Sequence, residues 1–199
     1  MTNVHVRRGA ITTLTVLLFV AARPTAQEDV RKLFEAGKYQ EVVARTPADG
    51  PPDAQYQKGL AHLKLNQGDA AKEAFGRLDG GAWKSVGQSA IAMTDGNQDA
   101  ALDAARSAVS ENPGLAEAQY QLGSVLEARN ERPAAAEAFV KATEANPQMA
   151  YAHYHAGMNF YEAKRVDRMA VYFENFLRLA PNAPERPAIE SIMRTVRGR

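Results

Sequence analysis

The sequence contains no cysteine. This absence excludes disulfide bonds, thiolate metal sites, a cysteine nucleophile and a lipid-modified cysteine. An excess of one charge is also missing, because 24 Lys and Arg against 23 Asp and Glu leave a formal net charge of +1. The basic residues are spread along the chain, so we expect no nucleic-acid partner. With 45% hydrophobic and 24% charged residues, the composition is that of a folded globular chain.

Motifs for catalysis and metal binding are absent as well. The sequence has no His-Glu-x-x-His, no glycine-rich phosphate loop and no Gly-x-Ser-x-Gly. His153 and His155 are two residues apart, which places them on different faces of a helix. The carboxylates are scattered and mostly lie at helical spacing from Lys or Arg. We therefore expect no enzymatic activity, no catalytic residue, no cofactor and no metal site.

No apolar run has the length of an ordinary transmembrane helix. The longest uncharged run near the start follows Arg7 and Arg8 and spans fourteen residues, Gly9 to Ala22. At about 1.5 Å per residue it reaches about 21 Å, less than a hydrocarbon core of about 30 Å. A basic start, a short apolar stretch and small residues after it indicate a secretory signal over residues 1–26. We expect a periplasmic or secreted protein; the alternative is an inner-membrane anchor formed by residues 9–22.

The sequence does contain an internal repeat. Residues 54–75 match residues 118–139 at eleven of 22 positions when the two segments are aligned at an offset of 64. An Asn-Pro or Ala-Pro pair also recurs every 34 residues, at Asn112-Pro113, Asn146-Pro147 and Ala180-Pro181. The segments beginning at Asn66, Gly96, Asn130 and Lys164 align at spacings of 30, 34 and 34.

These residues resemble the tetratricopeptide repeat, a 34-residue unit of helix, turn and helix. The pattern of that family has Leu-Gly in the first helix, then an alanine, an aromatic residue and a proline. Residues 116–149 fit it well, with Leu122-Gly123, Ala135, Phe139, Ala142 and Pro147. Residues 150–183 also fit, although Met169 replaces the usual alanine. Two units depart further: residues 82–115 have Ser89 for glycine and Ala105 for the aromatic residue, and residues 52–81 lack four residues and the closing proline.

The resemblance implies an all-α, right-handed helical solenoid of stacked hairpins. We expect nine to eleven short helices after residue 26 and no strands. A glycine inside a helix needs a packing reason, so we place Gly59, Gly123 and Gly157 against Ala71, Ala135 and Met169 of the partner helix. The domain organisation that we expect is a degenerate hairpin over 27–46, a linker over 47–53, four units over 52–81, 82–115, 116–149 and 150–183, and a capping helix over 184–199.

In repeats of this family the first helices line a concave surface, which implies a binding groove. The groove-facing positions hold five of the seven tyrosines and the only tryptophan. Such side chains give large contact areas with a polar tip and are frequent at interface hot spots. Three of the tyrosines recur at one repeat position and have packing between first helices as an alternative role. The candidate partner-binding residues are Tyr56, Trp83, Tyr120, Tyr151, Tyr154, His155, Met158 and Tyr161.

Two functions from different classes fit these features. The first is an exported binding module that holds a peptide or helix of another protein in its concave groove. The second is a structural adaptor of an envelope assembly, such as secretion, pilus or cell-wall machinery, which uses the convex face or the ends. In both cases the partner is a protein or peptide, the chain alone is a monomer, and only an uncleaved N-terminal segment would contact a membrane.

The expected signal can be tested by cell fractionation. A protein without residues 1–26 should appear in the soluble exported fraction, because the short apolar run is removed by cleavage. Full-length protein that stays in the inner membrane through salt and carbonate washes would instead show an anchor.

Overall fold

The computed structural model describes residues 26–198, and over that range it consists of eleven helices without strands. The predicted all-α helical solenoid is thus confirmed. Of the predicted signal, residues 1–25 lie outside the described residues. No helix within residues 26–198 is long and apolar enough to cross a membrane. The helices are α1 (Ala26–Glu35), α2 (Tyr39–Arg45), α3 (Pro52–Lys64), α4 (Gly68–Gly76), α5 (Gly81–Thr94), α6 (Gln98–Glu111), α7 (Ala116–Ala128), α8 (Arg132–Ala145), α9 (Ala150–Glu162), α10 (Val166–Leu179) and α11 (Arg186–Arg197).

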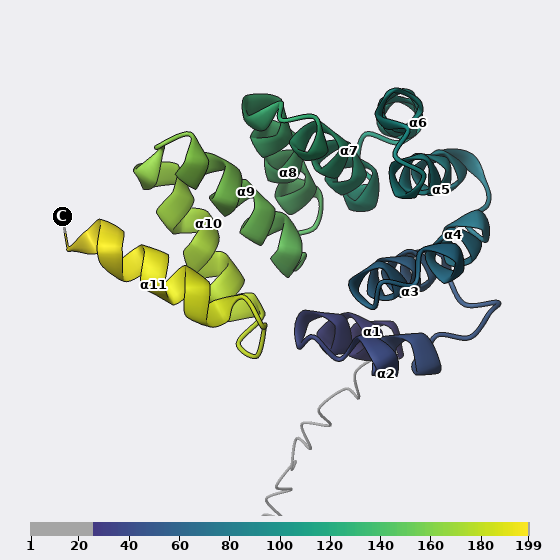
Figure 1. Cartoon of the computed structure of the whole chain (residues 1–199), viewed down its shortest axis with the longest axis horizontal. Coiled ribbons are helices and arrows are strands. Elements are labelled where there is room, and N and C mark those ends of the chain that lie inside the picture. The colour runs from purple at the N-terminus through teal and green to yellow at the C-terminus, as the bar shows by residue number, and fades with distance from the viewer. Residues whose placement is uncertain (1–25, 199) are drawn as a thin grey trace, which may run out of the picture.

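Helices α1 to α10 form successive hairpins along a curved row, and α11 follows them (Figure 1). The turn inside each hairpin has one residue in the left-handed backbone region. These residues recur at the spacing seen in the sequence, and they are Asn66, Gly96, Asn130 and Lys164, with φ of 59°, 77°, 62° and 58°. In each case the next residue donates its N–H to the carbonyl five residues back, as Gln67 does to His62 at 2.9 Å. This bond pattern ends the first helix and reverses the chain.

The first hairpin turns in the same way. Gly37 has a φ of 71°, and Lys38 donates its N–H to the carbonyl of Leu33 at 2.9 Å. The connection to α3 is held by side chains, because Gln55 donates to the carbonyl of Pro47 at 2.5 Å and Lys58 to that of Thr46 at 2.9 Å. The α1–α2 hairpin is therefore attached firmly to the next unit.

A phenylalanine ring lies against a glycine in three of the hairpins. Any side chain on the glycine would collide with the ring, which comes sixteen residues later on the second helix; the pairs are Gly59 with Phe75, Gly123 with Phe139 and Gly157 with Phe173. The nearest atoms thus belong to the phenylalanine and not to the alanine or Met169 that we expected there. All three rings are fully buried. The glycine is needed because only a bare Cα leaves room for the ring.

The unit over residues 82–115 replaces this pair with a hydrogen bond. Ser89 stands at the glycine position, and its hydroxyl donates to the carbonyl of Ala101 at 2.8 Å. Ala105 stands where the other units have phenylalanine, so no ring competes for the space. Gly87, two residues before Ser89, lies against the backbone carbonyl of Phe75 instead. The close approach has therefore moved from the interior of the hairpin to the contact between α4 and α5.

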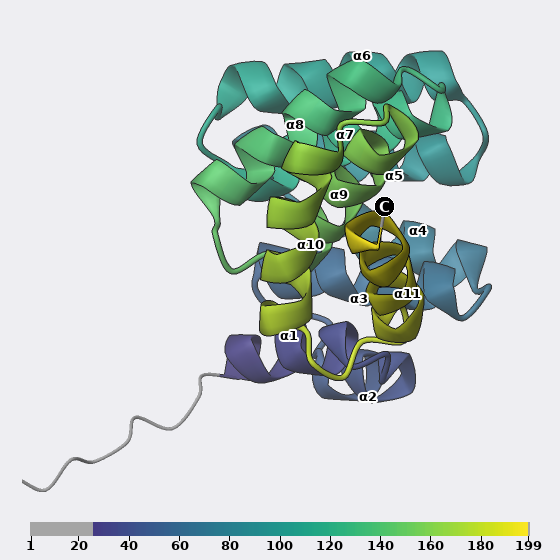
Figure 2. The same cartoon turned by 90° about the vertical axis from the view of Figure 1, so that its left-hand side faces the viewer.

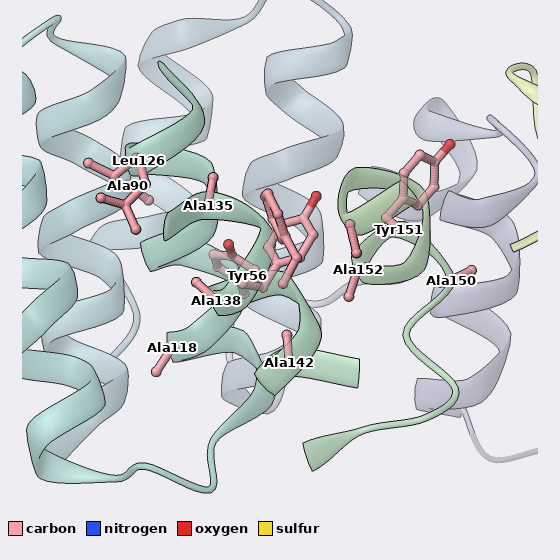
Figure 3. Packing of buried hydrophobic residues seen from close by; sticks show 14 of the residues in the cluster. Tyr56, Ala90, Ala118, Leu126, Ala135, Ala138, Ala142, Ala150, Tyr151 and Ala152 are labelled. Carbon is pink, nitrogen blue, oxygen red and sulfur yellow. The ribbon is translucent and has the colours of Figure 1, made fainter. Parts of the chain in front are cut away.

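Small side chains fill much of the core. The buried alanines Ala118, Ala135, Ala138 and Ala142 lie on the adjacent helices α7 and α8 (Figure 3). Alanine lets neighbouring helices approach closely while each still removes apolar surface from water. The buried cluster is continuous from Val30 in α1 to Met193 in α11. On α11, Ile189 and Met193 are buried, so this helix covers the apolar end of the row.

The row of hairpins curves until its two ends meet. The ring of Phe34 in α1 lies 5.4 Å from that of Tyr151 in α9, at an interplanar angle of 74°. Gly37 lies directly against the ring of Pro184, where a side chain would clash. Figures 1 and 2 show the α1–α2 hairpin beside the loop that leads into α11. The first hairpin thus covers one end of the concave side of the solenoid.

The structure predicts that Phe139→Ala lowers the free energy of unfolding by about 3–5 kcal/mol. Its ring is fully buried against Gly123 and stacks on His155 of the next unit, with centroids 4.9 Å apart. Because each unit is stabilised by its neighbours, the loss should lower the single urea midpoint of the whole chain. Val171→Ala is the matched control, since Val171 is 55% exposed. An unchanged midpoint for the Phe139 variant would contradict this account.

Candidate functional site

The first helices α3, α5, α7 and α9 line a groove on the concave face, as the repeat register predicts. It consists of two adjoining hollows of about 300 and 190 Å³, which share Leu60, Leu63 and Tyr120. We call them together the central groove. Its wall is largely apolar, with polar groups at a few positions. Its lining also includes Phe34, Lys64, Met93, Thr94, Gln121, Ser124, Tyr151 and His155.

A buried chain of hydrogen bonds connects three first helices beneath the groove. The hydroxyl of Tyr56 in α3 donates to Oε1 of Gln121 in α7 at 2.8 Å. The amide Nε2 of Gln121 in turn donates to Oγ of Ser89 in α5 at 3.2 Å. Tyr56 is 3% exposed, and burial raises its pKa well above the usual value. The hydrogen-bonding groups of these side chains are used by one another. They therefore hold α3, α5 and α7 together and offer no free donor to a ligand.

A second polar group lies at the far side of the groove. Nδ1 of His155 in α9 lies 2.9 Å from Oε2 of Glu127 in α7, and Nδ2 of Asn159 donates to Oε1 of the same carboxylate at 2.8 Å. Burial favours a higher pKa for Glu127, but the hydrogen bonds from His155 and Asn159 outweigh it and hold the pKa below the usual value. Glu127 therefore stays ionised and orients the imidazole along the groove wall.

The end of the groove is closed by the first hairpin and by Glu185. The hydroxyl of Tyr151 donates to Oε2 of Glu185 at 2.9 Å, while its ring contacts Phe34. Nζ of Lys64 lies 4.0 Å from Oε1 of Glu185 and 5.9 Å from the centroid of the Tyr151 ring. Burial and the nearby Glu185 carboxylate raise the pKa of Tyr151. The phenol thus remains protonated and keeps its donor role at any physiological pH.

A separate hollow of about 80 Å³ lies between α1, α3, α7 and the start of α9. We call it the closed cavity after the first hairpin, which covers it, although part of it opens to solvent. Its walls carry Phe34, Tyr56, Tyr120 and Tyr151 together with Glu35, Asp53, Glu117 and Arg31. Leu60 and Tyr120 line both this cavity and the central groove. The cavity therefore adjoins the groove and exists only because α1 folds back over the concave face.

Glu35 is the most unusual charged group of the closed cavity. Its carboxyl group accepts a hydrogen bond from the backbone N–H of Ala150, at the start of α9. Glu35 is 7% exposed, and its Oε1 has no hydrogen-bond partner within residues 26–198. Burial raises its pKa to about 7, although the charges of Arg31 and Lys32 favour a lower value. Burial also raises the pKa of Glu117 on the opposite wall.

Comparison with known proteins identifies the repeat units. Residues 116–149 and residues 151–183 each match a family model described as tetratricopeptide repeat. The chain contains tetratricopeptide repeats. The other hairpins of the described chain continue the same row of helices. No curated protein sequence matches the chain at a significant level.

Solved structures of similar shape include tetratricopeptide-repeat proteins. One is YrrB, described as a TPR protein with an unusual peptide-binding site, with 18% identity over 79% of this chain and 86% of that chain and a TM-score of 0.49. Another is MamA, with 20% identity, coverage of 79% and 96%, and a TM-score of 0.49. A third is MamA from Desulfovibrio magneticus RS-1, with 19% identity, coverage of 77% and 92%, and a TM-score of 0.48.

The structure brings some of the candidate residues of this repeat protein together and separates others. Tyr120, Tyr151 and His155 line the central groove, and Tyr56, Tyr120 and Tyr151 line the closed cavity. Tyr154 and Met158 are half-buried and pack on the core, where Tyr154 contacts Phe176 at 5.2 Å. Trp83 packs on Tyr56 with centroids 6.4 Å apart, and Tyr161 is 40% exposed at the end of α9. Neither of these two lines the groove or the cavity.

Phe34 and Glu35 of the first hairpin are site residues that sequence reasoning missed. Their repeat register marks them only as the end of a first helix. Nothing in the local pattern reports that this helix contacts a residue more than 110 positions later, as Phe34 does with Tyr151. The one signal present is a glutamate next to an aromatic residue at a helix end, and this pair is too common on exposed helix faces to be useful. Within residues 26–198, no three His, Asp or Glu side chains are placed to hold a metal ion.

The raised pKa of Glu35 predicts a specific dependence of stability on pH. Its folded pKa of about 7 exceeds the unfolded value of 4.5, so the folded state binds the proton more tightly. The free energy of unfolding should therefore fall as pH rises from about 5 to about 7. Glu35→Gln removes this loss and keeps an acceptor for Ala150, so the variant should exceed the parent at pH 8 by up to about 3 kcal/mol.

Urea denaturation at several pH values checks this prediction. The difference between the parent and Glu35→Gln isolates the contribution of Glu35, since His153, whose burial lowers its pKa, is present in both proteins. Glu144→Gln is the matched control, because Glu144 is exposed. Equal pH dependence in the parent and in Glu35→Gln would refute the assignment of this pKa.

Proposed function

We propose that the chain is an exported protein-binding module that holds a peptide or helical segment of another protein in the central groove. The observation that carries the proposal is the groove itself, an open and largely apolar hollow along α3, α5, α7 and α9. Leu63, a large apolar residue, stays 37% exposed there. Tetratricopeptide repeats form a scaffold for protein interaction, and the sequence offers no motif for catalysis, which supports binding as the activity.

The chemistry of the groove favours a mixed segment with apolar anchors. Leu60, Leu63 and Met93 provide surface on which apolar side chains lose contact with water. Ser124, Thr94 and the His155–Glu127 pair offer polar groups at its edges. Methionine adapts its shape to different partners. We expect modest affinity, about micromolar, because an extended segment loses conformational entropy when it binds.

The contact between the first hairpin and α9 changes which of the candidate residues can contact a partner. Tyr151 already contacts Phe34 of the same chain and donates to Glu185, so it forms part of the groove wall. We therefore propose Leu63 as the principal exposed contact, with His155 and Tyr120 beside it. Trp83 and Tyr161 would contact a partner only where a bound segment extends beyond the groove toward α5 or the end of α9.

The alternative function is a structural adaptor in an envelope assembly. One observation favours it: a hollow of about 560 Å³ lies outside the groove, where the short helix α4 meets α5. Ala48, Arg77, Lys84 and Ile91 are among its lining residues. An adaptor would use such an outer surface and leave the central groove empty.

Two arginine substitutions distinguish these functions. The parent is first used to recover its partner from an envelope extract, and the partner is identified by mass spectrometry. Leu63→Arg should then weaken binding at least tenfold, or about 1.4 kcal/mol, because it places a charge in the apolar groove. Val171→Arg, on the outer helix α10, should change binding less than twofold. The reverse result, with loss only in Val171→Arg, would support the adaptor and refute the groove.

A further inference from the structure

We propose that the closed cavity is a binding site for an aliphatic ammonium group. The cavity is formed by α1, α3, α7 and the start of α9, and four aromatic rings face it: Phe34, Tyr56, Tyr120 and Tyr151. Aromatic faces attract ammonium groups through their ring quadrupole, most strongly where water is excluded. The cavity thus combines apolar walls for a carbon chain with a surface that favours a positive charge.

An unused acceptor lies in the wall of this cavity. Oε1 of Glu35 is without a hydrogen-bond partner among the described residues, although the side chain is 93% buried, with 7% of its surface exposed. Gln57, which also lines the cavity, has a buried and unpartnered Oε1 as well. A buried acceptor without a donor is costly. An ammonium group carries three donors and no acceptor, so it is the kind of partner that each of these oxygens lacks.

The charges of the cavity wall point to the same class of ligand. Three carboxylates line it, on three different helices: Glu35 on α1, Asp53 on α3 and Glu117 on α7. Arg31 is the one cationic side chain among the lining residues that the structure describes. The guanidinium of Arg31 lowers the pKa values of Glu35 and Glu117, yet burial raises both by more. A monovalent cation inside the cavity would offset the charges of Glu35 and Glu117 when these carboxyl groups are ionised.

Size and access limit the ligand further. A volume of about 80 Å³ holds several water molecules, each of which needs about 10–15 Å³ on this measure. The end of an alkylamine fits this space, whereas a large ring system does not. Because Leu60 and Tyr120 line both hollows, the ammonium has two sources: a free small amine, or the lysine side chain of a peptide in the central groove. Only the lysine source rests on the proposed function.

Calorimetric titration of the purified protein with n-butylammonium chloride at constant ionic strength tests the site. We expect saturable binding at pH 8 and none for 1-butanol, which has the same shape but no charge. Glu35→Gln and Glu117→Gln should each weaken binding at least tenfold, and Glu144→Gln should leave it unchanged. Arg31→Gln should strengthen binding, because it removes the competing cation. Binding to the parent should be weaker at pH 6 than at pH 8, where Glu35 is ionised.

Competition experiments separate the two sources. A groove-binding peptide with one lysine should displace butylammonium, and the same peptide with norleucine at that position should not. If butylammonium binds and the lysine peptide does not compete, the site belongs to free amines and stands independently of the groove. The proposal is overturned if butylammonium fails to bind, if 1-butanol binds equally well, or if both glutamine variants bind butylammonium as the parent does.

Discussion

The contact between a phenylalanine ring and a bare glycine backbone is the constraint on which the solenoid depends. It fixes the distance between the two helices of a hairpin, and it repeats in three of the units. The same ring reaches the neighbouring unit, as Phe139 does with His155. The hairpin and its stacking are thus determined by one side chain. Where Ala105 replaces the ring, Ser89 and Gly87 restore the close approach by a hydrogen bond and by a tighter contact with α4.

The rotation between successive hairpins accumulates along the row and sets its curvature. The curvature brings α1 against α9, and the contact between Phe34 and Tyr151 then covers one end of the concave side. Closure has two consequences for function. It makes Tyr151 part of the groove wall, and it covers a cavity that no single repeat contains. A binding surface in this protein is therefore a property of the whole arc, including the hairpin that departs most from the repeat pattern.

Electrostatics divides the concave face into two kinds of site. Beside the groove, Glu127 is satisfied by His155 and Asn159 and remains ionised. In the closed cavity, Glu35 lacks such partners, and burial raises its pKa. The groove suits an uncharged or mixed segment, whereas the cavity suits a positive charge. These differences come from neighbours supplied by distant helices, since both glutamates lie near the ends of first helices and have similar local sequences.

The sequence by itself determined the helical hairpins and their order. A 34-residue period, glycines inside helices and a turn residue at Asn66, Gly96, Asn130 and Lys164 depend on local geometry, which a sequence pattern records directly. The register also placed Tyr120, Tyr151 and His155 on the concave face. Only the tertiary structure decided that Phe34 and Glu35 reach α9, that Trp83 and Tyr161 lie outside the groove, and that Glu35 is buried without a full set of partners. Those features depend on the summed rotation between successive hairpins, and no local pattern encodes that sum.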